Sequence, residues 1–314
     1  MRAVRVTGWG VAPTVDEVAD PVAGPATSIV RIEAATVAHI DHTIWAGRFL
    51  RHPPLPYTPG VEGAGTVVES GRFEAGERVW IRGGGLGTAA DGTWAELVAA
   101  PDESLGVLPA DVPFDTGAAF FSPCASAWTA LHRIGELRAG QCVAVTGAAG
   151  AVGSVAVQLA LDAGAEVVAT VSRQERLELL PDAVTGVVVT GDAPVEVPPV
   201  DLLVDTVGGA VLTTVLPAVR PGGRAVLVGY LAGHRAELDL PTFIQRDVSV
   251  HPLNMVRREA AARADVDELF ARLADGRIGV DVTTFPLDEA AAALDWLESP
   301  DHRGRAVLRP GAAA

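Results

Sequence analysis

Lysine is absent from this chain of 314 residues, so every strongly basic side chain is an arginine. A phosphate-binding P-loop requires a lysine beside its glycines, and catalysis through a protein Schiff base requires one as well. Both functions are therefore excluded. The net charge of -15 argues against a general binding surface for nucleic acid or for anionic membranes, because those partners are themselves negatively charged.

Cysteines and long apolar runs are also scarce. The two cysteines, Cys124 and Cys142, do not form a disulfide framework and indicate a reducing compartment. No apolar run approaches the length of a membrane span. Residues 1–7 alternate like a strand and lack the apolar core of a signal peptide. We therefore expect a cytoplasmic protein.

The pattern of the chain changes near residue 118. Before it, short β-type runs at 28–38, 65–68, 78–81 and 94–98 are separated by glycine and proline turns, as in a small barrel or sandwich. After it, small-residue helices alternate with apolar strands, which indicates parallel βαβ units. These strands are expected at residues 143–145, 167–171, 187–189, 202–205 and 225–229, with a last strand at 248–251 on the sheet edge.

Two helices and a strand are expected near the end of the chain. Val266, Leu269, Phe270 and Leu273 fall at helical spacing, and Gly276 supplies a stop. A second helix is expected at residues 287–298 and a strand at 305–308. We expect this strand to return to the N-terminal barrel, which makes the first domain discontinuous.

The stretch from residue 143 to residue 160 reads as a strand, a turn of small residues and a helix. Ala148, Gly150 and Gly153 occupy the glycine positions of G-x-G-x-x-G, with alanine in the first place. Small residues let the backbone approach a pyrophosphate, and the helix N-terminus offers it N–H groups and the positive end of a dipole. The stretch predicts a dinucleotide-binding site.

Several motifs, in this order, together resemble the medium-chain dehydrogenase/reductase superfamily in its zinc-free quinone oxidoreductase branch. Residues 59–65 (PGVEGAG) resemble its P-G-x-E-x-x-G segment, residues 76–79 (GERV) its G-D-x-V turn, and residues 148–153 its nucleotide loop. Later landmarks match at residues 204–209 and 222–226. The resemblance covers nearly the whole chain. It implies an α/β fold with a GroES-like, β-rich catalytic domain at 1–122 and 257–314, a doubly wound Rossmann domain at 123–256, and a cleft between them.

The resemblance also places the three zinc ligands of related alcohol dehydrogenases on this chain. They fall on Ala38, Val61 and Ser122, none of which is a good zinc ligand. Residues 82–95 contain no cysteine, so the lobe that holds a structural zinc is missing. We expect no metal. The alternative is a rearranged site made of four other side chains: His39, Asp41, His42 and Cys124.

The strand that ends at Val171 continues into Ser172 and Arg173, with Arg176 one turn further on. An acidic residue at this position selects NAD, whereas arginine accommodates the 2′-phosphate of NADP. The sequence therefore predicts NADP(H), unless both arginines are only solvated charges at a helix start. The residues expected to bind the cofactor are Ser126, Ala148, Ala149, Gly150, Ala151, Val152, Gly153, Ser172, Arg173, Arg176, Val207, Gly229, Tyr230, Leu253 and Asn254.

Residues 39–45 concentrate polar side chains where the family places its catalytic site. Many relatives use an asparagine or a tyrosine near the positions held here by Ala38 and Thr43, so those roles are not preserved. The remaining candidates for a proton donor or an orienting group are His42, His39, Asp41 and Tyr57. Asp41 alternatively caps a short helix. Six apolar side chains either line the acceptor site or belong to the core: Trp45, Phe49, Leu50, Phe120, Phe121 and Trp128.

We therefore expect a reductase that transfers hydride from NADPH to a quinone or to an α,β-unsaturated carbonyl or enoyl compound, without zinc. Two alternatives remain: a non-catalytic nucleotide-binding member of the fold, and a tailoring enzyme of a biosynthetic pathway. The expected acceptor is small and hydrophobic or aromatic. Pairing of the edge strand at 248–251 with its copy predicts a homodimer.

Overall fold

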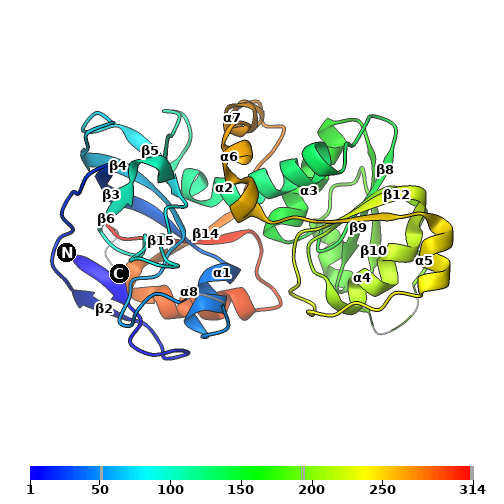
Figure 1. Ribbon diagram of the computed structural model, residues 1–314, viewed down its shortest axis with the longest axis horizontal. Helices are drawn as coiled ribbons and strands as arrows, with labels where there is room; N and C mark the ends of the chain where they lie inside the picture. The colour runs from blue at the N-terminus through cyan, green and yellow to red at the C-terminus, as the bar shows by residue number, and fades with distance from the viewer. Residues whose placement is uncertain (50–51, 192, 194, 312–314) are drawn as a thin grey trace. The chain divides into compact units, whose positions relative to one another are not determined.

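The computed structural model describes residues 1–49, 52–191, 193 and 195–311, and the chain divides into two compact units (Figure 1). Unit 1 comprises Met1–Phe121 and Val280–Ala314, and unit 2 comprises Ser122–Gly279. Residues 257–279, which were expected in the first domain, lie in unit 2. Two ion pairs attach this segment to the rest of unit 2: Asp265 pairs with Arg133, and Arg272 pairs with Asp162.

Unit 1 is built on a seven-stranded sheet. Six of its strands follow the order β14-β15-β3-β4-β5-β7, and the seventh, β6, lies off this path and pairs with β3. A separate hairpin joins β1 to β2. The strands are β1 (Arg2–Arg5), β2 (Thr14–Glu17), β3 (Thr27–Val37), β4 (Glu62–Glu69), β5 (Arg78–Arg82), β6 (Leu97–Pro101), β7 (Leu105–Val107), β14 (Val282–Pro286) and β15 (Arg305–Arg309). The helices are α1 (His39–Trp45), η1 (Asp102–Ser104), η5 (Leu287–Glu289), α8 (Ala290–Glu298) and the first part of α2 (Phe114–Trp128).

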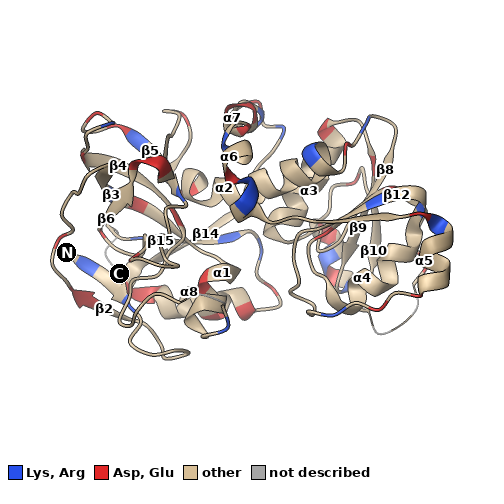
Figure 2. Cartoon of the chain, viewed as in Figure 1, with Lys and Arg blue, Asp and Glu red and all other residues tan. Residues whose placement is uncertain are grey.

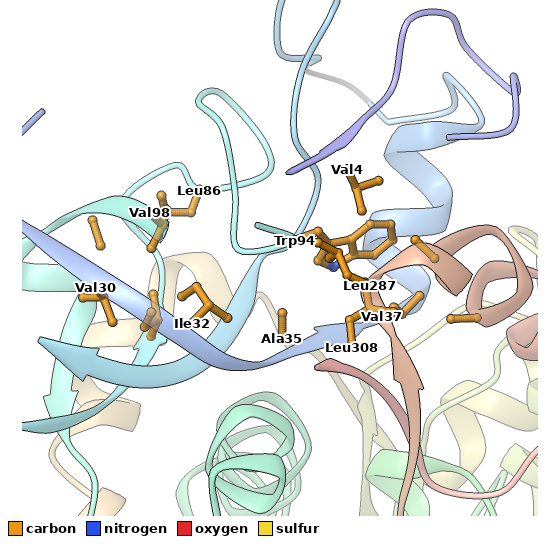
Figure 3. Close-up of a cluster of buried hydrophobic side chains, with 14 of the residues drawn as sticks. Val4, Val30, Ile32, Ala35, Val37, Leu86, Trp94, Val98, Leu287 and Leu308 are labelled. Atoms are coloured by element: carbon orange, nitrogen blue, oxygen red, sulfur yellow. The ribbon is translucent and has the colours of Figure 1, made fainter. Parts of the chain in front are cut away.

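The expected return of the chain end to the first domain is confirmed. Strand β15 pairs antiparallel with β3, with Ala306 opposite Val37 and Leu308 opposite Ala35. Figure 3 shows the core that forms beside this pairing, where the indole of Trp94 lies among Val4, Leu287 and Val37. Burying a side chain of this size contributes roughly 3 kcal/mol.

One strand begins later than expected. Residues 94–98 alternate in the sequence, but β6 starts at Leu97. The indole N–H of Trp94 donates to the carbonyl oxygen of Thr36 at 2.7 Å, and the backbone N–H of Trp94 donates to Pro59 at 3.0 Å. Trp94 therefore joins the core and the turn before β4 instead of the ladder between β6 and β3.

Unit 2 contains a six-stranded, fully parallel sheet with the order β10-β9-β8-β11-β12-β13. The chain starts in the middle, moves to one edge and then to the other, which is the doubly wound arrangement that was expected. The strands are β8 (Cys142–Val145), β9 (Glu166–Val171), β10 (Thr185–Val188), β11 (Val200–Asp205), β12 (Val219–Leu227) and β13 (Ser249–Pro252).

Helical segments connect the strands of unit 2. They are η2 (Thr129–Ile134), α3 (Ala151–Asp162), η3 (Gln174–Leu179), α4 (Gly209–Val215), η4 (Leu216–Ala218), α5 (Leu240–Arg246), α6 (Met255–Arg263) and α7 (Val266–Ala274). Segment η2 continues α2 as a π-helical turn. The described part of the chain has no helix that is long and apolar enough to cross a membrane. Figure 2 shows acidic and basic residues interspersed in both units.

Candidate cofactor and acceptor sites

The turn between β8 and α3 in unit 2 brings backbone N–H groups to the carboxyl end of the sheet. Gly147 adopts a left-handed conformation with φ of 61°. Helix α3 begins at the N-cap residue Gly150, whose N–H donates to the carbonyl oxygen of Gly147 at 2.9 Å. Gly150 has no side chain with which to cap the first N–H groups of α3, and N–H groups at such a helix start can bind an anion.

Gly153 permits the close approach of α3 to this turn. A Cβ atom at Gly153 would lie 2.1 Å from the carbonyl oxygen of Gly147, whereas one at Gly150 would lie 3.2 Å from the same atom. The glycine that makes the sharp turn is therefore Gly147, which precedes the motif identified in the sequence. The buried Ala148 holds the next position through an N–H donated to Thr170 at 3.0 Å.

The residues after β9 carry positive charge at the position that contacts the adenosine ribose in this fold. Ser172 follows the strand, Arg173 is the N-cap of η3, and Arg176 lies within η3. Both arginines are half-buried, and Ser172 is exposed. The strand end thus offers guanidinium groups, which suit a phosphate better than a ribose hydroxyl.

Most of the other expected cofactor residues follow strands of the same parallel sheet. Val207 follows β11, Gly229 and Tyr230 follow β12, and Leu253 follows β13. Parallel strands bring these loops to one edge of the sheet, where ligands bind in doubly wound folds. Asn254 has a structural role, because its Oδ1 accepts the Arg257 N–H at 3.2 Å and caps α6. Ser126 is buried within α2.

In unit 1, the carboxyl group of Asp41 holds the start of α1. Its Oδ2 accepts the N–H of Ala38 at 2.9 Å, and its Oδ1 accepts the N–H of Val61 at 3.2 Å. Burial raises the pKa of Asp41 to about 7, although the Ala38 N–H opposes this shift. Asp41 is 1% exposed, so it orients α1 against the turn before β4 rather than reaching a ligand directly.

A second buried carboxylate, Glu62, lies at the start of β4. Its Oε2 accepts from Nη2 of Arg305 at 2.5 Å, and its Oε1 lies 3.5 Å from Nε of Arg82. Glu62 is 1% exposed and Arg305 is 8% exposed. This ion pair ties β4 to β15 and leaves neither charge uncompensated.

His39 and His42 lie on α1, next to the end of α8. Nδ1 of His42 is 3.4 Å from Oε1 of Glu298. The ring centroid of His39 is 5.9 Å from that of His302. Burial, with help from the charges of His302 and Arg305, lowers the pKa of His39 to about 4. His39 is therefore neutral at pH 7 and can donate a hydrogen bond, but it holds no extra proton to transfer.

Tyr57 is the fourth candidate, and its side chain is 1% exposed. Within the described residues its hydroxyl has no hydrogen-bond partner. It packs with Val6, Ile44 and Val61. Burial and the nearby charge of Asp41 raise the pKa of Tyr57, so the hydroxyl stays protonated.

The apolar candidates divide between core and partly buried positions. Phe120 is fully buried, and Phe121 stacks on Trp80 with ring centroids 5.0 Å apart. Trp45 and Phe49 are half-buried and pack against the cluster that contains Tyr57. Trp128 lies in unit 2, with its ring centroid 4.2 Å from that of His132. Leu50 lies outside the described residues.

The residues do not fit a catalytic zinc ion. Ala38 and Val61 have no donor atoms in their side chains, and their N–H groups are bound by Asp41. Among the residues that the structure describes, no cluster of three or more His, Cys, Asp or Glu side chains is arranged to hold a metal. In the rearranged set, both carboxylate oxygens of Asp41 already accept backbone N–H groups.

Two family models match the chain. Residues 24–110 match the alcohol dehydrogenase GroES-like domain, and residues 164–308 match the zinc-binding dehydrogenase model. The quinone oxidoreductase of Lama guanicoe is 33% identical over 182 residues, which cover 56% of this chain and 54% of that protein. The chain thus matches about half the length of this relative.

Two further proteins match almost the whole chain. An alcohol dehydrogenase of Rhizobium meliloti is 27% identical over 98% of both chains. The quinone oxidoreductase of Thermus thermophilus, whose structures include a complex with NADPH, is 28% identical with a TM-score of 0.78, over 98% of this chain and 100% of that one. The same two-part architecture therefore occurs in proteins named for either kind of activity.

Proposed function

Because the chain belongs to the medium-chain dehydrogenase/reductase superfamily, in its quinone oxidoreductase branch, we propose that it is an NADPH-dependent oxidoreductase that works without zinc. Its acceptor is a quinone or an α,β-unsaturated carbonyl or enoyl compound. One observation carries the proposal: the start of α3, with its glycine N-cap, and the arginines after β9 follow two neighbouring parallel strands, so both lie at the carboxyl edge of the sheet, where a dinucleotide binds.

Unit 2 supplies the binding groups for the cofactor. When the cofactor binds, the N–H groups of residues 151–153 would bind its pyrophosphate, and Arg173 and Arg176 would hold its 2′-phosphate. NADPH, when bound, supplies the hydride. The Thermus thermophilus quinone oxidoreductase, which has been solved in complex with NADPH, supports the choice of NADPH over NADH.

Unit 1 supplies the groups that act on the acceptor oxygen. His42 and His39 are the hydrogen-bond donors on α1, and Asp41 positions that helix. Neutral His39 stabilises developing negative charge by donating a hydrogen bond, whereas Tyr57, which is as buried as Asp41, packs behind α1 and supports it. His42 transfers the proton, with Glu298 holding its Nδ1 side. The half-buried Trp45 and Phe49 provide apolar surface for the ring of the acceptor.

We also propose that the protein is a homodimer. Strand β13 is the last strand of its sheet, so one edge of its backbone is left for pairing. Leu240 and Ile244 of α5, the helix that directly precedes β13 in the chain, are 59% and 73% exposed. Pairing of β13 with its copy would cover these side chains across a two-fold axis.

Titration of the purified protein with NADPH and NADH, followed by an acceptor panel, tests the function. We expect saturable binding that favours NADPH, and NADPH oxidation with quinones or with enones and enoyl thioesters. Binding without turnover on the whole panel would support the non-catalytic alternative. Stoichiometric zinc that is lost together with activity under chelation would overturn the zinc-free proposal.

A further inference from the structure

Asp205, the last residue of β11, contacts three segments at the carboxyl edge of the unit 2 sheet. It is fully buried. Its Oδ1 accepts from the Thr146 hydroxyl at 2.6 Å, and its Oδ2 accepts the Gly208 N–H at 2.9 Å. Its backbone carbonyl accepts the Val228 N–H at 2.7 Å. One residue thus connects the ends of β8, β11 and β12.

Thr146 and Thr206 add a reciprocal pair of hydrogen bonds. The Thr206 N–H donates to Oγ1 of Thr146 at 2.9 Å, and the Thr206 hydroxyl donates to the Thr146 carbonyl oxygen at 2.7 Å. The Thr146 hydroxyl therefore accepts a hydrogen bond from the Thr206 N–H and donates one to Oδ1 of Asp205. Thr146 directly precedes Gly147, so this network fixes the start of the nucleotide turn.

The segments after β11 and β12 approach each other backbone to backbone. A Cβ atom at Gly229 would lie 2.2 Å from the Thr206 carbonyl oxygen, and one at Gly209 would lie 2.3 Å from the Ala232 carbonyl oxygen. The Ala232 N–H donates to the Val207 carbonyl at 2.7 Å. No side chain fits between these segments, so a shift of one moves the other.

The carboxylate of Asp205 does not form a salt bridge within the part of the chain that the structure describes; its bonds come from neutral donors. Burial raises its pKa, and the bonds from Thr146 and Gly208 counteract that rise. Burying a carboxylate without a cationic partner costs free energy, but the carboxylate of Asp205 provides two acceptor oxygens for two buried donors. An apolar residue of similar size would leave both donors unpaired.

We propose that Asp205 is a positioning residue for the dinucleotide, because it sets the nucleotide turn at 147–153, the turn at 206–209 and the loop at 228–233 in one fixed arrangement. The inference rests on the proposed function, in which unit 2 binds NADPH. Asp205 itself does not touch the cofactor; it acts through the backbone of the three segments.

The test compares Asp205→Asn with a matched variant at the opposite end of the same strands. Asp201 of β11 accepts the N–H of Cys142, the first residue of β8, at 2.8 Å, and pairs with Arg220. Asp201→Asn therefore weakens the same strand pair away from the expected cofactor edge. Asn at position 205 keeps the shape of the side chain but replaces one acceptor oxygen with a donor.

We expect Asp205→Asn to raise the dissociation constant for NADPH at least about tenfold, as the loss of one buried hydrogen bond can do. Asp201→Asn should leave it within about twofold, although both variants lose thermal stability. Amide hydrogen exchange of residues 146–153 and 228–233 in the cofactor-free protein should rise in Asp205→Asn only.

A double-mutant cycle with Thr146→Val tests whether Asp205 affects NADPH binding through its contact with Thr146. We expect the double variant Asp205→Asn/Thr146→Val to bind NADPH no more weakly than the worse single variant, because both substitutions disrupt one connected set of hydrogen bonds around Thr146 and Asp205. Thr146→Ser, which keeps the hydroxyl, should restore most of the affinity. If Asp205→Asn does not fold, the same comparison of NADPH affinity is made between Thr146→Val and Thr146→Ser.

Equal NADPH affinity in Asp205→Asn and the wild type would overturn the positioning role, and so would equal losses in Asp205→Asn and Asp201→Asn. Failure of the wild type to bind either NADPH or NADH is a different result, because it refutes the proposed function itself. The two failures are therefore distinguishable in one titration series.

Discussion

Replacing Asp41 with asparagine should change how the stability of unit 1 depends on pH. Burial raises the pKa of Asp41 from 3.8 to about 7, so the carboxyl group gains a proton more readily in the folded chain than in the unfolded one. A carboxyl group of this kind stabilises the fold fully below about pH 4, and the contribution is lost as the pH rises through about 7. Asparagine has no such dependence.

The size of the effect follows from the shift. A rise of about three pKa units corresponds to about 4 kcal/mol, at about 1.4 kcal/mol per unit. The unfolding free energy of the wild type minus that of Asp41→Asn should therefore fall by about 4 kcal/mol between about pH 4 and about pH 8. The pH dependence of the wild-type unfolding free energy does not show this fall by itself, because His39 acts in the opposite direction. The pKa of His39 is lowered to about 4, so its contribution to stability is lost as the pH falls from 6.5 to about 4.

Urea unfolding followed by tryptophan fluorescence measures the difference at each pH. Five of the six tryptophans, Trp9, Trp45, Trp80, Trp94 and Trp296, lie in unit 1, so the signal reports mainly on that unit. A difference that stays constant over this pH range would refute the reasoning. It would mean that the two N–H groups bound to Asp41 fully offset the cost of burying its charge.

Three further outcomes follow from the cofactor edge and from the sheet edge. Gly153→Ala should weaken NADPH binding at least about tenfold in titrations, since its Cβ would meet the Gly147 carbonyl oxygen at 2.1 Å, whereas Gly150→Ala, at 3.2 Å, should have a smaller effect; equal losses would contradict this. Arg173→Ala should raise the KM for NADPH about tenfold or more and leave that for NADH nearly unchanged, and equal changes would remove Arg173 from the 2′-phosphate site. Ile244→Glu should convert a dimer to a monomer in light scattering, because it places a charge on an exposed apolar helix face, and an unchanged mass would reject that interface.

The architecture followed from patterns that act over short distances. Alternating β-type runs predicted the strands of unit 1, and apolar strands separated by small-residue helices predicted the doubly wound sheet of unit 2. The strand expected at residues 305–308 also returns to the first domain, where β15 pairs with β3. These features depend on local propensity and on connection rules, which the sequence contains directly.

The contacts that hold the sites together were not visible in the same way. Asp205 and Thr146 are 59 residues apart, and Glu62 and Arg305 are 243 residues apart, so only the folded chain brings them together. Gly147 was missed because the motif aligned on Ala148, although the left-handed φ belongs to Gly147. The burial of Tyr57 likewise depends on partners from three separate segments.

Unit 1 is made of two separate stretches of the chain, which affects the order in which the two units can fold during synthesis. Unit 2 is one continuous stretch, Ser122–Gly279, so all of its strands are synthesised before β14 and β15 of unit 1. Strand β3 is synthesised early, yet it gains β15 as a neighbour only after Arg305–Arg309 has emerged. The cofactor-binding half is therefore able to fold before the half with α1, whose sheet is complete only once Arg305–Arg309 has been made.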